Sequence, residues 1–265
     1  WEDRISIQRS KEQDLSDAVE TRVEAFLKQK RVEANAGQLS AGRCDVLRVH
    51  LHHFRDWLGA MTSVTKINGK VITNYHSELV GGIEAKRSSA AYAKDHFGSV
   101  KSFVRWLWTT EAIESLPRVL GTKNLKISAG VKTPAVFTPD EIGKLLKRAT
   151  DRTKLYILLM LNAGMTQKDI CDLLQSEVDW KAGSITRKRS KTASHDTVPT
   201  VQYRLWPETF RLLLQERAKD GEHALLNIDG GPLKVEVMGT DGKLKKIDNV
   251  ASAFSPLRRI TKIQT

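Results

Sequence analysis

Signals for disulfides, metals and membrane spans are scarce in this sequence. Its 265 residues contain two cysteines, Cys44 and Cys171, which lie far apart and match neither a zinc motif nor a disulfide framework. No apolar run reaches the roughly 18 residues that a membrane span needs, and the polar N-terminus has no signal-peptide pattern. We therefore expect a protein of a reducing, intracellular compartment, with no bound metal and no membrane partner.

Acidic residues are also in short supply. Forty-three Lys and Arg stand against 31 Asp and Glu, which gives a formal net charge of +12. The surplus is even, because 21 basic and 15 acidic residues occur up to Ala135 and 22 and 16 occur after it. Spread-out basic residues favour a polyanionic partner, with nucleic acid first, because neutralised phosphates release their counterions. Solubility alone is the alternative explanation.

The first half of the chain predicts helices only. Ser40 is a plausible N-cap, and Gly59 follows the same apolar pattern as a stop signal. Four amphipathic helices with short connections predict a helical bundle over residues 14–116, behind an N-terminal extension of residues 1–13. The four segments with apolar residues at helical spacing are residues 17–30, 40–59, 68–82 and 88–113.

A basic segment without acidic residues follows. From residue 115 to 139 there is no Asp or Glu, and Lys123 and Lys126 are two of its four basic residues, set among glycines and prolines. This composition predicts a linker at residues 117–136, either beside a phosphate backbone or simply solvated.

The second half, residues 137–265, predicts a mixed α+β domain. Thr138, Pro139 and Glu141 form a capping-box signature at its start. Residues 184–189 and 196–201 predict the two strands of a hairpin. The other predicted elements are helices at 155–164, 207–218 and 248–262 and a strand at 224–228.

The stretch LNAGMTQKDICDLLQSEVDW, residues 161–180, has the pattern of a glycine-led turn that opens a helix. Thr166 supplies a hydroxyl acceptor and Asp169 a carboxylate three residues later, which is a capping box. The helix dipole also favours an acidic residue in the first turn. The pattern predicts that a helix begins at Thr166.

Several of these segments resemble the tyrosine recombinases, the phage-integrase-type site-specific DNA recombinases. In the second half they are LLMLNAGMTQKDICDLLQSEVDW, ITRKRSKTASHDTVPT and FTPDEIGKLLKRA, and in the first half the aromatic-rich SVKSFVRWLW. The resemblance implies a mainly α protein, with a helical core-binding domain and a mixed α+β catalytic domain that carries a small antiparallel hairpin. It also implies a two-domain clamp around double-stranded DNA, a homotetramer on that DNA, and a cytoplasmic location at the nucleoid in a bacterial or phage-type system.

The implied chemistry is strand cleavage and rejoining through a 3′-phosphotyrosine, without an external cofactor. Lys191 matches the hairpin lysine that protonates the leaving oxygen, although an ordinary surface lysine is the alternative. Asp169 matches an acidic residue that supports the active site. Thr166 stands where the resemblance implies an arginine, and a threonine cannot present a charged bidentate fork to phosphate. Lys168 is the nearest cation in sequence.

The family's His-x-x-Arg segment does not occur in the second half, and none of the tyrosines has the context of the nucleophile. We therefore expect this chain to be truncated before its nucleophile. The four tyrosines are Tyr75, Tyr92, Tyr156 and Tyr203.

Basic and polar residues at helix starts and in the hairpin are the expected DNA contacts, with a plainly solvated charge as the alternative for each. In the helical half they are Arg43, Lys86, Arg87, Ser88, Tyr92, Lys94, Lys101 and Arg105. Beyond it they are Lys123, Lys126, Arg187, Lys188, Arg189 and His195.

Three functions stay open at this point. The first is a recombinase for DNA integration or excision, the second a catalytically degenerate recombinase-like accessory or regulatory protein, and the third a general helical nucleic-acid-binding module. A His-x-x-Arg and a later tyrosine in the reading frame past Thr265 would favour the first, and a stop codon there the second. Salt-dependent binding without site preference would favour the third.

Overall fold

The computed structural model describes residues 15–130, 134–190, 197–239 and 242–261. The chain divides into two compact units. The first unit is Trp1–Lys132 with Met238–Leu244, and the second is Thr133–Val237 with Lys245–Thr265. The domain boundaries at residues 116 and 137 stay predictions. Among the described residues, no helix combines the length and the apolar character that crossing a membrane requires.

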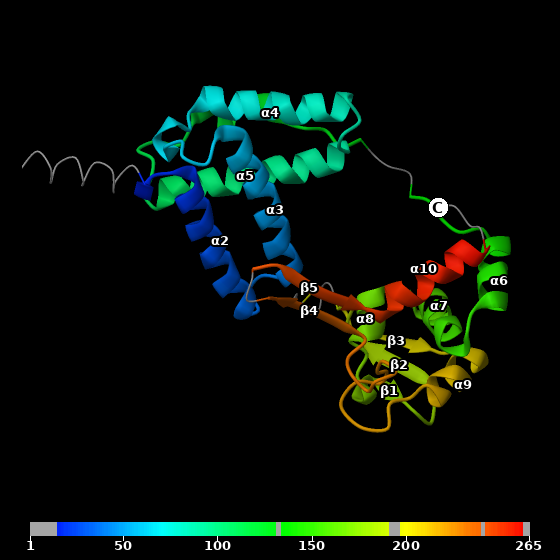
Figure 1. Ribbon diagram of the computed structural model, residues 1–265. Coiled ribbons are helices and arrows are strands. Elements are labelled where there is room, and N and C mark those ends of the chain that lie inside the picture. The colour runs from blue at the N-terminus through cyan, green and yellow to red at the C-terminus, as the bar shows by residue number, and fades with distance from the viewer. Residues whose placement is uncertain (1–14, 131–133, 191–196, 240–241, 262–265) are drawn as a thin grey trace, which may run out of the picture. The chain divides into compact units, whose positions relative to one another are not determined.

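The first unit is the predicted helical bundle. Its helices are α2 (Val19–Asn35), α3 (Ala41–Leu58), α4 (Gly69–Glu84) and α5 (Ala90–Thr109). Helix α2 packs on α3 and α5, and α4 packs on α5 (Figure 1). Large apolar side chains from all four helices fill one core, among them Phe26, Phe54, Ile72 and Phe103. The helical spacing of apolar residues therefore predicted these four helices correctly.

Side-chain caps define where these helices begin. The Ser40 side chain accepts a hydrogen bond from the backbone N–H of Arg43, and Ser89 does the same for Tyr92. Asn68 accepts from Lys70 and Val71. Each cap satisfies backbone donors that have no partner inside the helix. The predicted N-cap at Ser40 is confirmed.

Helices α4 and α5 both end with a charged residue in the left-handed conformation. Lys86 has φ 57° and Glu111 has φ 59°. After α4, the N–H of Arg87 donates to the carbonyl of Gly82 and that of Lys86 to Ile83; after α5, Ala112 and Glu111 repeat the pattern. This is the Schellman motif, in which glycine is the preferred residue at the left-handed position. Both residues therefore carry backbone strain that a glycine would lack.

The segment after α5 packs onto the bundle. It forms the short 3₁₀ helices η2 (Arg118–Gly121) and η3 (Lys123–Leu125). Leu120, Leu125 and Ile127 are buried in the core of the first unit. The basic residues and glycines of this stretch led to the prediction of a linker from residue 117. Three of its apolar side chains nevertheless pack in the core.

The second unit contains five α-helices among its described residues, and two of them, α6 (Pro139–Arg148) and α8 (Gln167–Cys171), begin at the predicted caps. Helix α7 (Asp151–Ala163) was predicted from residue 155 but begins at Asp151, because Thr150 caps it. Helix α6 has the capping box: Thr138 N–H donates to Glu141 Oε2 at 2.8 Å, and the Thr138 hydroxyl accepts from the Glu141 N–H. The core gathers Leu155, Leu159, Ile170 and Leu212. The other helices are α9 (Pro207–Gln215) and α10 (Asn249–Thr261).

A three-stranded antiparallel sheet lies beside these helices, in the order β1-β2-β3. Its strands are β1 (Val178–Asp179), β2 (Ser184–Arg187) and β3 (Val201–Arg204), with Ile185 opposite Tyr203. The hairpin prediction located β2 correctly but placed the second strand at residues 196–201, which is wrong. Pro199 has no backbone N–H to donate to a ladder, so pairing begins only at Val201.

The strand predicted at residues 224–228 is also wrong. Ala224 and Leu225 are buried, but the Ala224 N–H donates to Leu173 and its carbonyl accepts from Ala218, so this segment joins the core as irregular backbone. The strands of this region are instead β4 (Lys234–Met238) and β5 (Leu244–Asp248), which form a two-stranded sheet that the sequence pattern did not predict.

Candidate functional site

Helix α8 begins at the threonine that stands where the resemblance implies an arginine. Helix α7 ends at Ala163, with Gly164 as its C-cap at φ 60°, and α8 begins at Gln167 with Thr166 as its N-cap. The Thr166 hydroxyl and N–H both donate to Asp169 Oδ2, at 2.6 and 2.8 Å, and the Asp169 N–H donates back to the hydroxyl. Thr166 is therefore a working N-cap, and the predicted helix start is confirmed.

Asp169 is a buried carboxylate with every oxygen in use. Its side chain is enclosed, and Oδ1 accepts the backbone N–H of Ser190 at 2.8 Å. Burial by itself raises the pKa of this carboxyl, but the hydrogen bonds from Thr166 and Ser190 outweigh it and lower the pKa to about 2. Asp169 thus stays ionised at neutral pH and ties α8 to the residue before Lys191.

Arg187 lies inside the second unit rather than on its surface. Its side chain is 6% exposed, and it comes from the same face of β2 as the buried Ile185. The sequence predicted an exposed DNA contact here, because the run RKR reads as uniformly basic. Side chains alternate between the two faces of a strand, so Arg187 points to the same side as Ile185. Of the three basic residues, Arg187 alone is therefore buried.

The structure describes some, but not all, of the other site residues predicted in this region. Thr166 and Lys168 are exposed, Lys188 is half-exposed and Arg189 is exposed. Lys191 and His195 lie outside the described residues, so their assignments stay predictions.

In the first unit, exposed and half-exposed cations follow one side of α5. Residues 94, 98, 101, 102 and 105 recur at helical spacing, and we call them the α5 face: Lys94, Gly98, Lys101, Ser102 and Arg105. A side chain at Gly98 would meet open space. Lys101 lies over the ring of Phe97, with Nζ 4.6 Å from its centroid, and burial, followed by the charge of Arg105, lowers its pKa. Asp95 is the one acidic residue in α5.

Two of the expected DNA contacts are engaged in ion pairs on the protein. Arg43 pairs with Asp95 at 3.0 Å and Arg87 with Glu78 at 3.2 Å, and all four side chains are substantially exposed. Such exposed pairs contribute little stability, so they leave these guanidinium groups available for exchange with a phosphate.

The remaining expected contacts of the first unit are placed as follows. Lys86, Tyr92 and Lys126 are exposed and Ser88 is half-exposed, while Lys123 belongs to η3 and its side chain is not among those described.

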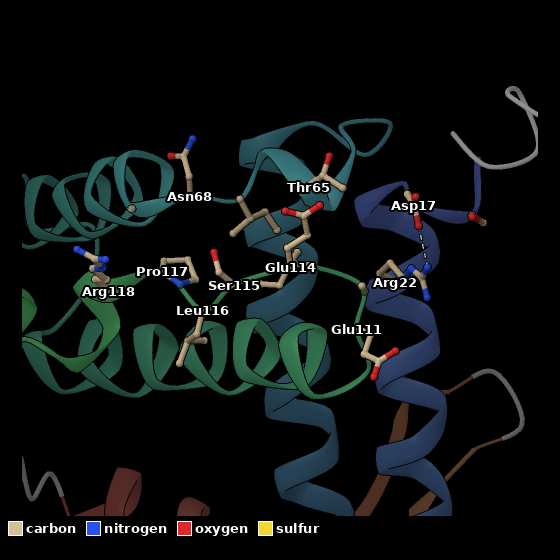
Figure 2. Close-up of a pocket in the computed structure, with 15 residues that line it drawn as sticks. Asp17, Arg22, Thr65, Asn68, Glu111, Glu114, Ser115, Leu116, Pro117 and Arg118 are labelled. Atoms are coloured by element: carbon tan, nitrogen blue, oxygen red, sulfur yellow. Dashed lines mark hydrogen bonds and ion pairs between the residues drawn. The ribbon is translucent and has the colours of Figure 1, made fainter.

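A hollow of about 1170 Å³ opens elsewhere on the first unit (Figure 2). Carboxylates line it, from Asp17, Glu111 and Glu114, together with Arg22 and Arg118. Arg22 donates to Asp17 at 2.7 Å. This mixture of charges does not favour a phosphate, in contrast to the α5 face. No group of three or more His, Cys, Asp or Glu side chains in the described part of the chain is arranged to hold a metal ion.

Comparison by sequence identifies a relative over about a third of the chain. No family model matches the chain. Tyrosine recombinase XerA of Thermococcus kodakarensis is 28% identical over 96 residues, which cover 35% of this chain and 33% of that protein.

Solved structures are similar over nearly the whole chain. A lambda integrase dimer bound to a COC′ core site superposes with a TM-score of 0.62 and 16% identity, over 91% of this chain and 64% of that one. Lambda integrase bound to DNA gives 0.63 and 15%, over 94% and 80%. The Tn1549 transposon integrase in complex with a circular intermediate DNA gives 0.57 and 12%, over 94% and 80%. The chain therefore has the fold of the phage-integrase-type tyrosine recombinases, as its sequence motifs predicted.

Proposed function

We propose that this chain is the DNA-clamping part of a site-specific recombinase that cleaves and rejoins strands through a 3′-phosphotyrosine. The observation that carries the proposal is the fold, which is shared over 91% or more of the chain with integrases whose structures contain DNA. The net charge of +12 and the cationic α5 face support it. Under this proposal Lys191 is the general acid, with Asp169 holding the segment that leads to it.

We further propose that the nucleophile is neither Tyr75 nor Tyr156. Tyr75 is buried, and its hydroxyl is already bonded to His53 and His96. Tyr156 is 2% exposed, and burial raises its pKa to about 12. Both hydroxyls are therefore closed to a phosphodiester.

The second candidate function is an accessory or regulatory DNA-binding protein without cleavage activity. The observation that favours it is Thr166, whose side chain is used to cap α8 where the resemblance implies a cation. To separate the two, the native reading frame is expressed to its end and incubated with a nicked suicide substrate. A covalent protein–DNA adduct supports the recombinase, and intact binding without an adduct supports the accessory protein.

DNA binding by the α5 face gives a prediction for salt dependence. Replacing Lys94, Lys101 and Arg105 together with Ala should reduce the slope of log K against log salt by about 2–3, because each lost phosphate contact removes about 0.9. The measurement is a fluorescence-anisotropy titration with duplex DNA at several salt concentrations.

The matched control removes three exposed cations of the same unit, Lys28, Lys66 and Lys70. An equal change of slope in both variants would show that only net charge matters, and the α5 face would lose its assignment.

The strained Lys86 gives a second prediction. Lys86→Gly should raise the free energy of unfolding by about 0.5–1 kcal/mol, because glycine adopts φ 57° without steric cost. The same change should weaken duplex binding, because one cation is lost. Glu111→Gly relieves the same strain at the end of α5 and is the control, with the stability gain but without the loss in binding. Thermal unfolding and DNA titration of both variants measure the two effects.

A further inference from the structure

A buried arginine in the second unit has no part in the chemistry proposed so far. The Arg187 guanidinium donates from Nη1 to the carbonyl of Asp169 at 2.7 Å and from Nη2 to the Ser190 hydroxyl at 2.8 Å. Its Nε donates to the carbonyl of Lys188 at 3.3 Å. All three guanidinium nitrogens are thus engaged by the protein, on a side chain that is 6% exposed.

Two carboxylates balance the charge of this guanidinium. Glu177 Oε2 lies 3.5 Å from Nη1 and Asp169 Oδ1 lies 3.9 Å from Nη2. Both carboxylates also accept backbone N–H groups, Glu177 from Leu174 and Asp169 from Thr166 and Ser190. A buried cation is tolerated only with such pairing, and removing one partner leaves an uncompensated charge.

These contacts converge on Ser190. The Ser190 N–H donates to Asp169 Oδ1, and the Ser190 hydroxyl accepts from Arg187 Nη2. The backbone and the side chain of Ser190 are therefore both restrained. Asp169 comes from the start of α8 and Arg187 from the end of β2. The position of Ser190 is therefore set by two elements that are 18 residues apart in sequence.

We propose that Arg187 is a positioning residue that fixes Ser190, the residue before Lys191 in sequence, between α8 and β2. An effect of Arg187 on strand cleavage rests on the proposed function, in which Lys191 is the general acid. The anchoring of Ser190 by Arg187 does not depend on that proposal. The requirement is for the shape of arginine and not only for its charge. The lysine side chain has a single nitrogen, which cannot take the place of two guanidinium nitrogens that donate to the carbonyl of Asp169 and to the hydroxyl of Ser190.

The test measures the amide hydrogen-exchange rate at position 190 in the full-length native protein. Arg187→Lys should accelerate exchange of the Ser190 amide by about tenfold or more. In the variant this segment can open without breaking the two hydrogen bonds that the guanidinium group donates to Asp169 and Ser190. Ser190→Ala keeps both carboxylates paired with Arg187 and should also accelerate exchange of the amide at position 190. Arg189→Met, which changes the neighbouring exposed cation, is the control and should leave that amide unchanged.

A second readout separates positioning from general destabilisation. In Arg187→Lys, the rate of adduct formation on a nicked substrate should fall at least about tenfold while duplex affinity stays within about threefold, because the buried side chain touches no DNA. A variant that is merely less folded would lose both in proportion.

The outcomes distinguish the two claims. If the wild-type protein forms no adduct, the proposed function fails, and exchange at position 190 still decides the role of Arg187. If Arg187→Lys and Ser190→Ala both leave the exchange of that amide at the wild-type rate, Arg187 does not position Ser190. If Arg187→Lys fails to fold, the exchange rate in Ser190→Ala decides between the two outcomes.

Discussion

Asp169→Ala is expected to destabilise the second unit by roughly 3–5 kcal/mol, the usual cost of removing one partner from a buried ion pair. The substitution removes the capping box of α8 and leaves the Ser190 N–H without its acceptor. It also leaves the buried Arg187 with Glu177 as the one remaining carboxylate within 4 Å among the described residues. Three separate losses at one residue explain the size of the effect.

The measurement is the free energy of opening from hydrogen exchange in α7 and α9, which reports this unit by itself. Asp172→Ala is the control, because Asp172 is half-exposed and caps only the end of α8 through its backbone. A loss below about 1 kcal/mol for Asp169→Ala, within the range of an ordinary cap, would show that the carboxylate does not hold Arg187 in place.

The carboxylate also predicts a pH dependence. Its pKa is about 2 in the fold against 3.8 as the ordinary value, so the folded state favours the ionised form. The stabilisation is complete above pH 3.8 and is lost as pH falls toward 2, by about 2 kcal/mol for a shift of this size. Asp169→Asn should remove that dependence in the second unit.

Acid below pH 6.5 is expected to destabilise the first unit through His96. This residue on α5 is 1% exposed and stacks on His50 of α3, with ring centroids 4.3 Å apart. Its Nε2 lies 2.8 Å from the hydroxyl of Tyr75 and 2.9 Å from the carbonyl of His50. Burial and then the charge of His50 lower the pKa of His96 to about 4.

The sign follows from the direction of this shift. The unfolded chain takes up the proton near pH 6.5 and the fold only near pH 4, so the neutral form is the folded form. The bundle is fully stable above pH 6.5 and loses about 3 kcal/mol as pH falls from 6.5 to 4, with no further loss from this group below pH 4. Burial lowers the pKa of His50 in the same direction, against the charge of Asp95.

The measurement is hydrogen exchange in α3 and α5 between pH 7.5 and 4, corrected for the intrinsic rate. His96→Gln is expected to flatten the dependence, although it lowers stability at neutral pH. His223→Gln changes a half-exposed histidine of the second unit and is the control. His53, Tyr92 and the Arg43–Asp95 pair also face the cluster. A flat profile in the wild-type protein would mean that the charge of Asp95 offsets burial and that the fold does not lower the pKa of His96.

Much of the architecture was predictable because its signals are local. The Thr138 and Thr166 capping boxes are written within four residues each, and both occur as predicted. In α2 the stripe of Val19, Val23, Phe26 and Leu27 reports a buried helix face through its spacing alone. The charge surplus is a sum over residues and needs no fold.

The errors occur where the partner of a segment is far away in sequence. Strand β3 pairs with β2 from Val201 onward, opposite Arg187, and Ala224 is not in a strand because its backbone partners are Leu173 and Ala218. The missed sheet of β4 and β5 carried a weak local signal, the Asp-Gly pair at residues 241–242.

The sequence by itself determined most of the helices, the caps at Ser40, Thr138 and Thr166, the basic character and the likeness to integrases, since each depends on neighbours along the chain. Only the tertiary structure decided which charges are interior. Arg187 looks like its neighbours Lys188 and Arg189 until Asp169, Glu177 and Ser190 enclose it. His50 and His96 look like ordinary helix residues until α3 and α5 press their rings together. Burial and pairing depend on the whole fold, because they are set by what surrounds a side chain and not by its place in the chain.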